Sequence, residues 1–152
     1  MTLDSIDRAI LMALQRDGRL SNVMLAEEVG LSESACLRRV KLLERNGIID
    51  RYTMLVDQVG AGKSGNVFVQ ITLGRQTHVE LETFEAAVRD VPEVMECYLM
   101  TGTSDYLLRV IVEDTSDYER LHTQYLTCLP GVVRVHSSFA LRTVTKKTMI
   151  PF

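Results

Sequence analysis

The sequence of 152 residues has few cysteines, no long hydrophobic run and no excess of positive charge. Its three cysteines are odd in number and lie far apart, which argues against a disulfide framework and against the ligand spacing of a zinc site. We interpret Cys36, Cys97 and Cys128 as small buried hydrophobic residues. We expect neither a metal nor another cofactor.

The missing hydrophobic run and the missing positive charge exclude further classes of protein. No apolar stretch approaches the roughly 20 residues that a membrane-spanning helix needs. The first residues, M-T-L-D-S-I-D-R, carry acids where a signal peptide carries basic residues, so we expect a cytoplasmic protein without membrane contact. Because the net charge is -3, any contact with nucleic acid must come from a local patch.

The first fifty residues follow the helical period. Leu3, Ile6, Ile10 and Leu14 fall on one stripe and predict a first amphipathic helix. Asp4 is placed to cap its start, because an acidic side chain can accept hydrogen bonds from the free amides of the first turn.

Two more helices follow after short turns. Ser21 is placed to cap a short second helix, which Gly30 ends. Ser32 is placed to cap a longer third helix, which ends at Gly47. Two short helices and a longer one, with a glycine-containing turn before the last, have the spacing of a helix-turn-helix.

From Ile48 onward the pattern becomes that of strands. Residues 48–56 are β-prone, and the glycine-rich segment 57–65 is interpreted as a linker. Amphipathic helices are expected at 78–90 and at 116–129, the latter capped by Ser116 or Asp117. The expected strands are 66–73, 94–101, 106–112 and 132–144. The order βαββαβ is that of a ferredoxin-like sandwich with both helices on one sheet face, so the predicted class is α+β.

The third helix combines an apolar back with a basic front. Cys36, Val40 and Leu43 recur at helical spacing and predict the buried side. Between positions 32 and 46 there are four cations and two acids, in a half that is otherwise acidic. Short polar and long cationic side chains near the N-terminal half are what a helix needs to reach base edges in the major groove.

The alternative is a solvated helix whose cations pair with Glu33 and Glu44. The preceding helix-turn spacing favours DNA binding over this alternative. The candidate DNA-binding residues are Ser32, Glu33, Ser34, Leu37, Arg38 and Lys41.

Four segments resemble the Lrp/AsnC (feast/famine) family of transcription regulators. They are L-D-x-x-D-R-x-I-L-x-x-L-Q-x-D-G-R at 3–19, S-N-V-x-L-A-x-x-V-G-L-S at 21–32, C-L-R-R-V-x-x-L-E-x-x-G-I-I at 36–49 and T-G-x-x-D-Y-L-L at 101–108. The resemblance covers essentially the whole chain. It implies a winged helix-turn-helix DNA-binding domain at 1–56, the linker at 57–65, and an effector-binding and oligomerisation domain at 66–152.

The same resemblance implies the partners of the protein. They are double-stranded DNA, a free amino acid as effector, and further copies of the chain. Dimers would form through the sheets and associate further, up to octamers. Such an assembly would cover the open sheet face, which a monomer would leave as an exposed apolar patch.

The fourth segment includes a loop whose chemistry suits an amino acid. The stretch L-M-T-G-T-S-D-Y-L-L at 99–108 places a polar centre between two apolar runs, which predicts two strands and a short loop. The resemblance implies that Leu99–Tyr106 lines the effector pocket at an interface between dimers. A glycine-containing turn can aim backbone amides at a carboxylate, and Asp105 can accept from an ammonium group.

Leu99 and Met100 suit an apolar effector such as leucine or methionine. The alternative for Asp105 is an Asx-turn with its own backbone. Arg134 and His136 share the parity of the outward residues on the last strand and are predicted to face a neighbouring subunit. The candidate effector-binding residues are Leu99, Met100, Thr101, Gly102, Thr103, Asp105, Tyr106, Arg134 and His136.

Two other functions compete with regulation. The resemblance extends to haem-pathway decarboxylases of the same architecture, whose chemistry needs a positioned acid or base, but His78, His122 and His136 form no recognisable catalytic cluster. An RNA-binding βαββαβ module needs stacked aromatic residues on a basic strand, and residues 106–112 carry a single aromatic. We therefore predict a DNA-binding regulator without enzymatic activity that responds to a free, apolar amino acid.

Overall fold

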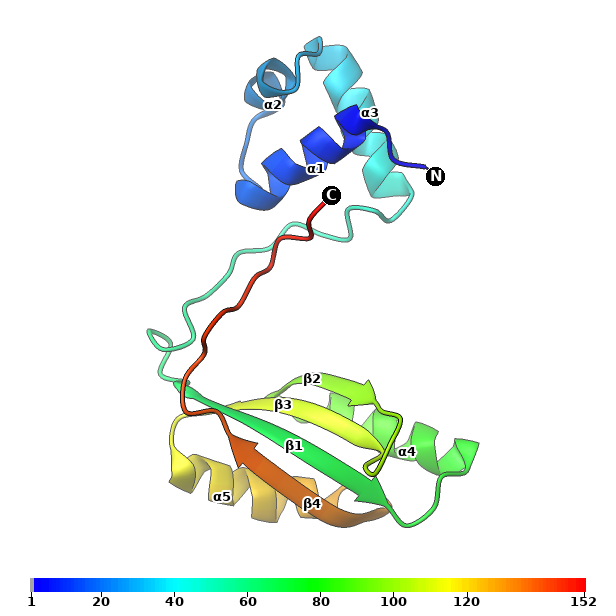
Figure 1. The fold of residues 1–152 in the computed structure, drawn as a ribbon, viewed down its shortest axis with the longest axis vertical. Coiled ribbons are helices and arrows are strands. Elements are labelled where there is room, and N and C mark those ends of the chain that lie inside the picture. Colours follow the sequence, from blue (N-terminus) through cyan, green and yellow to red (C-terminus); the bar gives the residue numbers. More distant parts are fainter. Residues whose placement is uncertain (1) are drawn as a thin grey trace. The chain divides into compact units, whose positions relative to one another are not determined.

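The computed structural model describes residues 2–152, which form two compact units (Figure 1). The helical unit comprises the chain up to Leu55 together with Val144–Phe152, and the sheet unit comprises Val56–Thr143. No helix within residues 2–152 is long and apolar enough to cross a membrane. The chain therefore passes from one unit to the other twice, and its last nine residues return to the unit in which it began.

The helical unit contains α1 (Ser5–Arg16), α2 (Asn22–Glu28) and α3 (Glu33–Arg45), and the predicted caps are confirmed. The carboxylate of Asp4 accepts a hydrogen bond from the backbone of Asp7 at 2.8 Å, and the Asp7 carboxylate accepts one from the backbone of Asp4 at 3.2 Å. This capping box satisfies amides that the helix itself leaves free. The hydroxyls of Ser21 and Ser32 accept from the backbone N–H of the third residue of α2 and of α3, respectively.

Left-handed glycines end the second and third helices, as the sequence predicts. Gly30 follows α2 with φ 68° and Gly47 follows α3 with φ 67°. A residue with a Cβ pays a steric cost in this conformation, whereas glycine does not. The two turns are therefore fixed locally, and they hold the three helices at helix-turn-helix spacing.

The predicted buried side of α3 is confirmed and packs on α1. Cys36 and Leu43 are completely buried together with Ile10 of α1, and Val40 packs against the same cluster. Arg39 adds an electrostatic link, because its Nη1 lies 2.8 Å from Asp4 Oδ2 and 2.7 Å from Asp7 Oδ1. The backbone amide of Asp7, followed by the Arg39 guanidinium, lowers the pKa of Asp4. Arg39 thus ties α3 to the first turn of α1.

The C-terminal segment Val144–Phe152 lies along α1 within the helical unit. The side-chain amide of Gln15 pairs with both backbone groups of Ile150: its Nε2 donates to the carbonyl at 3.1 Å, and its Oε1 accepts from the N–H at 2.6 Å. Ile150 and Phe152 also help to line a cavity of about 420 Å³ together with Leu14 and Tyr52. The Gln15 amide thus donates one hydrogen bond to the backbone of this segment and accepts one from it, as a residue of a neighbouring strand would.

The β-prone segment 48–56 forms no strand in the part of the chain that the structure describes, so the expected wing strand is not formed within this chain. Met54, Leu55 and Val56 are 81%, 72% and 64% exposed. Extended backbone becomes a strand only where a second segment exchanges hydrogen bonds with it. β-propensity alone could not supply that partner.

The sheet unit has the predicted βαββαβ order. Its elements are β1 (Gly65–Leu73), α4 (His78–Arg89), β2 (Val94–Leu99), β3 (Tyr106–Val112), α5 (Thr115–Gln124), a 3-10 turn at Leu126–Cys128, and β4 (Val132–Phe139). The strands are antiparallel neighbours in the order β2-β3-β1-β4. The last strand ends at Phe139 rather than at 144. The helix predicted at 116–129 is divided into α5 and the 3-10 turn.

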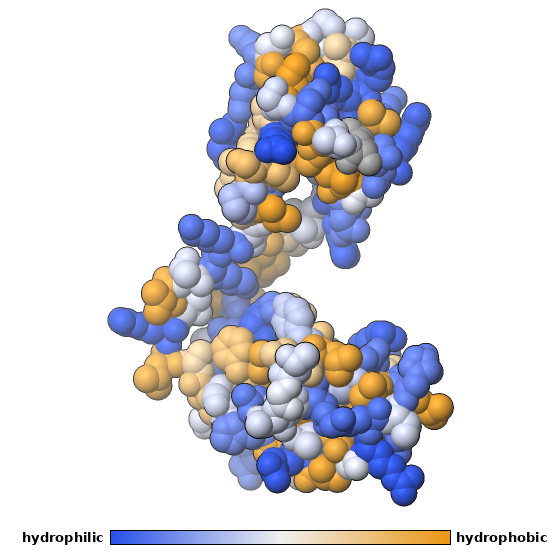
Figure 2. All heavy atoms as spheres, turned by 45° about the vertical axis from the view of Figure 1, so that its right-hand side comes forward, coloured by the Kyte–Doolittle hydropathy of each residue, from blue (hydrophilic) through white to orange (hydrophobic). Residues whose placement is uncertain are grey.

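The two faces of this sheet differ. Tyr106, Leu108 and Val110 of β3 are buried against α4 and α5, whose Phe84 and Leu121 belong to the same core. The alternate residues face the other way, and there Phe68 is 41% and Tyr98 52% exposed. Figure 2 shows that apolar side chains (orange) occur at the surface among hydrophilic ones over the molecule as a whole. We call the sheet face opposite α4 and α5 the open face. Its residues include Phe68, Gln70, Tyr98, Leu107, Arg109, Arg134 and His136.

The N-cap of α5 is neither of the two residues predicted to cap it, although Asp117, one of the two, still helps to hold the start of the helix. The N-cap is Asp114, whose carboxylate accepts from the backbone of Asp117 at 2.9 Å. The carboxylate of Asp117 accepts from the backbone of Glu113 at 3.0 Å and lies 2.7 Å from Arg120 and 3.2 Å from Lys63. These contacts lower its pKa from 3.8 to about 2.

We expect Asp117 to stabilise the sheet unit in a pH-dependent way. Because its pKa is lowered in the folded state by the Glu113 amide, Arg120 and Lys63, its contribution is complete above its unfolded value of 3.8 and is lost as the pH falls towards 2. Asp117→Asn should therefore lower the free energy of unfolding near neutral pH, and the deficit should shrink at about pH 2. Urea unfolding at both pH values measures this. Asp90→Asn, at the exposed end of α4, is the control; a deficit of equal size at both pH values would contradict the assignment.

Candidate functional site

The six predicted DNA-binding residues all lie exposed at the surface of the helical unit, at the start of α3 or on its outward side. Among the described residues, neither Arg38 nor Lys41 forms an ion pair, so the alternative in which the cations of α3 pair with Glu33 and Glu44 is not what the structure contains. Glu44 instead accepts a hydrogen bond from the Tyr52 hydroxyl at 3.0 Å. The outward face therefore keeps two cations for an external anion.

The loop between β2 and β3 is a closed hairpin. The backbone N–H of Met100 donates to the carbonyl of Asp105 at 2.8 Å. Gly102 has φ 126°, and a Cβ built there would meet no atom within 4 Å. Backbone conformation therefore requires the glycine, whereas space within this chain does not. Its approach to a ligand carboxylate stays a prediction.

Asp105 connects this loop to two other segments. Its side chain is buried, with the residue 8% exposed; Oδ2 accepts from the backbone of Leu73 at 2.7 Å and Oδ1 from Nε2 of Gln76 at 2.6 Å. Its own N–H donates to the carbonyl of Ile71 at 2.9 Å. The carboxylate thus bonds the end of β1 and the segment before α4, and the Asx-turn considered from the sequence is replaced by these longer-range bonds. Both oxygens already accept a hydrogen bond inside the protein.

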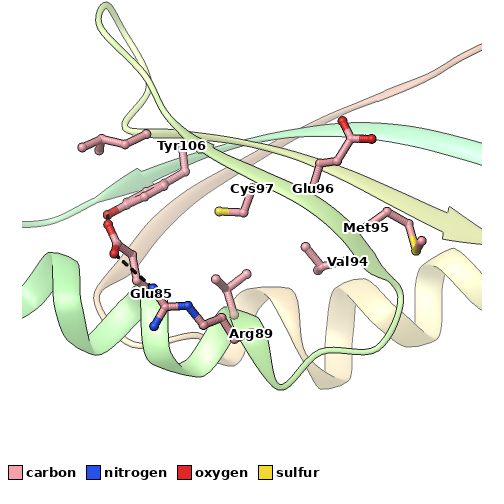
Figure 3. A pocket seen from close by; sticks show the side chains of 9 residues that line it. Glu85, Arg89, Val94, Met95, Glu96, Cys97 and Tyr106 are labelled. Atoms are coloured by element: carbon pink, nitrogen blue, oxygen red, sulfur yellow. Dashed lines mark hydrogen bonds and ion pairs between the residues drawn. The ribbon is translucent and has the colours of Figure 1, made fainter. Parts of the chain in front are cut away.

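A cavity of about 460 Å³ opens next to this loop, between α4 and β2 (Figure 3). Of the predicted effector residues, Leu99 and Tyr106 line it, and Met100 and the loop 101–105 do not. The cavity belongs to the helix-covered side of the sheet. Its lining comes from α4 (Glu85, Val88, Arg89), β2 (Val94, Met95, Glu96, Cys97, Leu99) and β3 (Tyr106).

Three polar side chains form a row along one wall of the cavity (Figure 3). The hydroxyl of Tyr106 donates to Glu85 Oε1 at 2.9 Å, and Glu85 Oε2 lies 3.7 Å from Nη2 of Arg89. Burial, reinforced by Glu85, raises the pKa of Tyr106, so its hydroxyl stays a proton donor. Burial also raises the pKa of Cys97 to about 11. The Cys97 thiol and the Tyr106 phenol therefore both keep their protons at neutral pH, next to the carboxylate of Glu85 and the guanidinium of Arg89.

Sequence reasoning did not identify Glu85, Arg89 or Cys97 as site residues. The only local signal was that Glu85 and Arg89 stand four residues apart and next to the inward Phe84 and Val88. Glu85 and Arg89 lie next to β2 because of the way α4 packs on the sheet, and a local sequence pattern does not predict that packing.

Arg134 and His136 lie away from this cavity in the same chain. Both are exposed on the open face, where β4 pairs with β1 through Thr72 and Gln70. Leu99 and Tyr106 pair with each other between β2 and β3, with Tyr106 turned to the helix-covered side. A role for Arg134 and His136 towards a neighbouring subunit stays a prediction.

Comparison with known proteins follows this division into units. Residues 3–44 match the model of the AsnC-type helix-turn-helix domain, and residues 66–150 match that of the Lrp/AsnC ligand binding domain. The chain is 44% identical over 149 residues to the Bkd operon transcriptional regulator of Pseudomonas aeruginosa, which covers 98% of this chain and 97% of that protein. It is 48% identical over 130 residues to the leucine-responsive regulatory protein of Escherichia coli, covering 86% and 79%.

A solved structure is similar over nearly the whole length. A transcriptional regulator from Neisseria meningitidis, crystallised as a complex with L-methionine, superposes with a TM-score of 0.93 at 38% identity. The match covers 99% of this chain and 97% of that one.

We expect Asp105 to matter for the loop through its contact with the β1 backbone more than through Gln76. Asp105→Ala leaves the buried N–H of Leu73 without an acceptor, which should lower the free energy of unfolding by about 1–3 kcal/mol. Gln76→Ala removes only a partner near the surface and should cost less. Urea unfolding of the two variants and the original protein makes the comparison. Equal losses would show that the Leu73 contact is not the important one.

Proposed function

The chain belongs to the Lrp/AsnC family of transcriptional regulators, with a helix-turn-helix domain and an amino-acid ligand-binding domain, and from this we propose that it binds specific DNA sites through α3 and adjusts its binding or assembly to a free, apolar amino acid. We further propose that the protein acts in the cytoplasm, because its target is DNA. The observation that carries the proposal is the outward face of α3, which keeps Arg38 and Lys41 exposed and unpaired among the described residues. Helix N-terminal residues of this kind contact bases, and long cations contact phosphates.

Three of the four cations of α3 differ in their partners. Arg39 is held by two acids of α1, so it supports the fold and has little charge to offer an external anion. Arg38 and Lys41 lie on the outward side together with Ser34 and Leu37. This division supports Arg38 as the base-reading residue and Lys41 as a phosphate contact.

Two findings support an apolar amino acid as the effector. The similar regulator from Neisseria meningitidis was crystallised with L-methionine, and the relative from Escherichia coli is named for its response to leucine. In this chain, Leu99 and Met100 flank the loop and are 60% and 42% exposed. Exposed apolar side chains beside a cavity suit a ligand with an apolar side chain.

We also propose that the open face joins two copies into a dimer that associates further. Phe68 and Tyr98 lie uncovered near Leu107 and Arg109 on this face. An isologous contact would bury both faces at once, since each copy presents the same surface. The exposed segment 54–56 supplies a second apolar surface in need of a partner.

Among relatives and in the site, no observation favours the decarboxylase alternative. His78 lies at the start of α4, 3.2 Å from Glu82, whereas His122 lies on α5 and His136 on the open face. The three histidines therefore do not converge on one acid–base site. The curated relatives compared above are regulators of transcription.

Replacing Arg38 by Ala should weaken binding to the cognate DNA by about 1–3 kcal/mol and relax sequence preference, because a base contact is lost. Lys41→Ala should weaken all sequences alike and reduce the slope of log affinity against log salt by about one. Gel shifts across a salt series on the protein's own promoter measure both. Arg75→Ala, which removes one charge from the sheet unit, is the control. Unchanged affinity in the Arg38→Ala/Lys41→Ala double variant would mean that another surface binds DNA.

Among the twenty amino acids, leucine or methionine should raise the melting temperature most. A ligand at 100 times its dissociation constant stabilises the folded state by about 2.7 kcal/mol. Thermal shifts identify the ligand, and light scattering with and without it reports the assembly. If none of the twenty amino acids raises the melting temperature, the proposed effector is wrong. If light scattering gives the mass of a single chain at micromolar concentration, the proposed assembly is wrong.

A further inference from the structure

We propose that the C-terminal segment Val144–Phe152 is part of the DNA-binding surface of the helical unit, with Lys146 and Lys147 contacting DNA phosphates. The inference rests on the proposed DNA binding through α3 and adds a contact from the other end of the sequence. Neither lysine is among the candidate DNA-binding residues, because both lie far from α3 in the sequence. They reach the same unit only because the chain returns to it.

This segment supplies the entire net positive charge of the helical unit. Residues 1–55 contain eight basic and eight acidic side chains, so their formal charges cancel. Val144–Phe152 adds two lysines and no acid, which gives the helical unit a side-chain charge of +2. The sheet unit has seven basic and twelve acidic side chains and therefore a charge of -5. A polyanion such as DNA is attracted to the helical unit, and the attraction at long range depends on the returning segment.

The segment is held against α1 rather than free in solvent. Gln15 exchanges two hydrogen bonds with the backbone of Ile150, at 3.1 Å and 2.6 Å. Met12, almost one turn earlier on α1, lines a cavity of about 530 Å³ together with residues 146–151. The two lysines are among the residues that line this cavity. Their charges are therefore fixed near α1, within the unit that carries the recognition helix.

The segment also lies beside the chain that follows α3. Thr148, Ile150 and Phe152 line the cavity of about 420 Å³ whose other walls include residues 48–53. Those residues were expected to form a wing strand after the third helix, and they form none. In DNA-binding domains, segments next to the recognition helix contact the phosphate backbone while the helix reads base edges. The C-terminal segment is placed to make such backbone contacts.

Both lysines have their charge available for an external anion. Each is exposed, and neither forms an ion pair within residues 2–152. Lys63 provides the contrast, because its ammonium group lies 2.9 Å from Glu113 and 3.2 Å from Asp117. An ammonium group on a flexible stem binds phosphate as a point charge and requires no fixed geometry. Lys146 and Lys147 therefore suit backbone contacts, which strengthen binding to every DNA sequence alike.

The test measures the DNA affinity of the full chain across a salt series, on the promoter duplex of its own gene and on a random-sequence duplex of equal length. Lys146→Gln/Lys147→Gln should weaken binding to both duplexes and reduce the slope of log affinity against log salt by about two. The affinity advantage of the original protein over this variant should accordingly shrink about tenfold between about 50 and 200 mM salt. Lys146→Arg/Lys147→Arg should keep the original slope, because it keeps both charges.

Arg142→Gln is the matched control. It removes an exposed positive charge from the same stretch of chain, but from the part that belongs to the sheet unit. Its salt slope should equal that of the original protein. Urea unfolding of all variants shows whether any loss of DNA affinity follows from a loss of folded protein.

The outcomes separate this inference from the proposed function. If Lys146→Gln/Lys147→Gln keeps the original slope while Arg38→Ala/Lys41→Ala loses affinity, the inference is wrong and the proposed DNA binding stands. The inference is also wrong if the lysine variant keeps its slope but changes the mass measured by light scattering without DNA. In that case the lysines contact the acidic sheet unit of another copy. If the original protein binds neither duplex, both the inference and the proposed DNA binding are wrong.

Discussion

The buried carboxylate of Asp105 is the contact on which the end of the sheet unit that carries the β2–β3 loop depends. It accepts from the backbone of Leu73, where β1 ends, and from Gln76, just before α4 begins. Three segments that are distant in sequence are therefore held to one another by a single charged side chain. Hydrogen bonds to a charged acceptor are stronger than neutral ones. Removing one partner of such a buried bond lowers the free energy of unfolding, because the other partner is left unsatisfied. The positions of the hairpin and of α4, hence of the cavity between them, follow from this contact.

Features governed by local interactions are the ones that the sequence predicts well. The caps Asp4, Ser21 and Ser32 and the left-handed Gly30 and Gly47 each act within one helical turn, and all five are as predicted. The alternation of buried and exposed residues along β3 is likewise a local property of a pleated strand. These signals together predict the helix-turn-helix and the βαββαβ order.

The sequence does not predict features that depend on a partner distant in the chain or on another chain. Arg39 resembles Arg38 and Lys41 in sequence, yet it belongs to the fold because α1 presents two acids to it. Glu85 and Arg89 line a cavity only because β2 packs beside α4, which their spacing in the sequence does not indicate. Residues 48–56 have strand propensity without a strand to pair with. In each case the sequence shows the chemical character of the residue, but not the residue that it contacts in the folded chain.

The return of the C-terminal segment makes the helical unit discontinuous in sequence. Since Gln15 holds Ile150 by both backbone groups, this unit is complete only when the first fifty-five residues and the last nine are present together. A single cut in the segment after Leu55 would leave the two units linked, because the chain also crosses between them near Val144. A gene fragment that ends before the sheet unit would in turn encode three helices without the peptide that lies against α1. Exchanging the first fifty-five residues alone would therefore separate Gln15 from the segment that it binds in this chain.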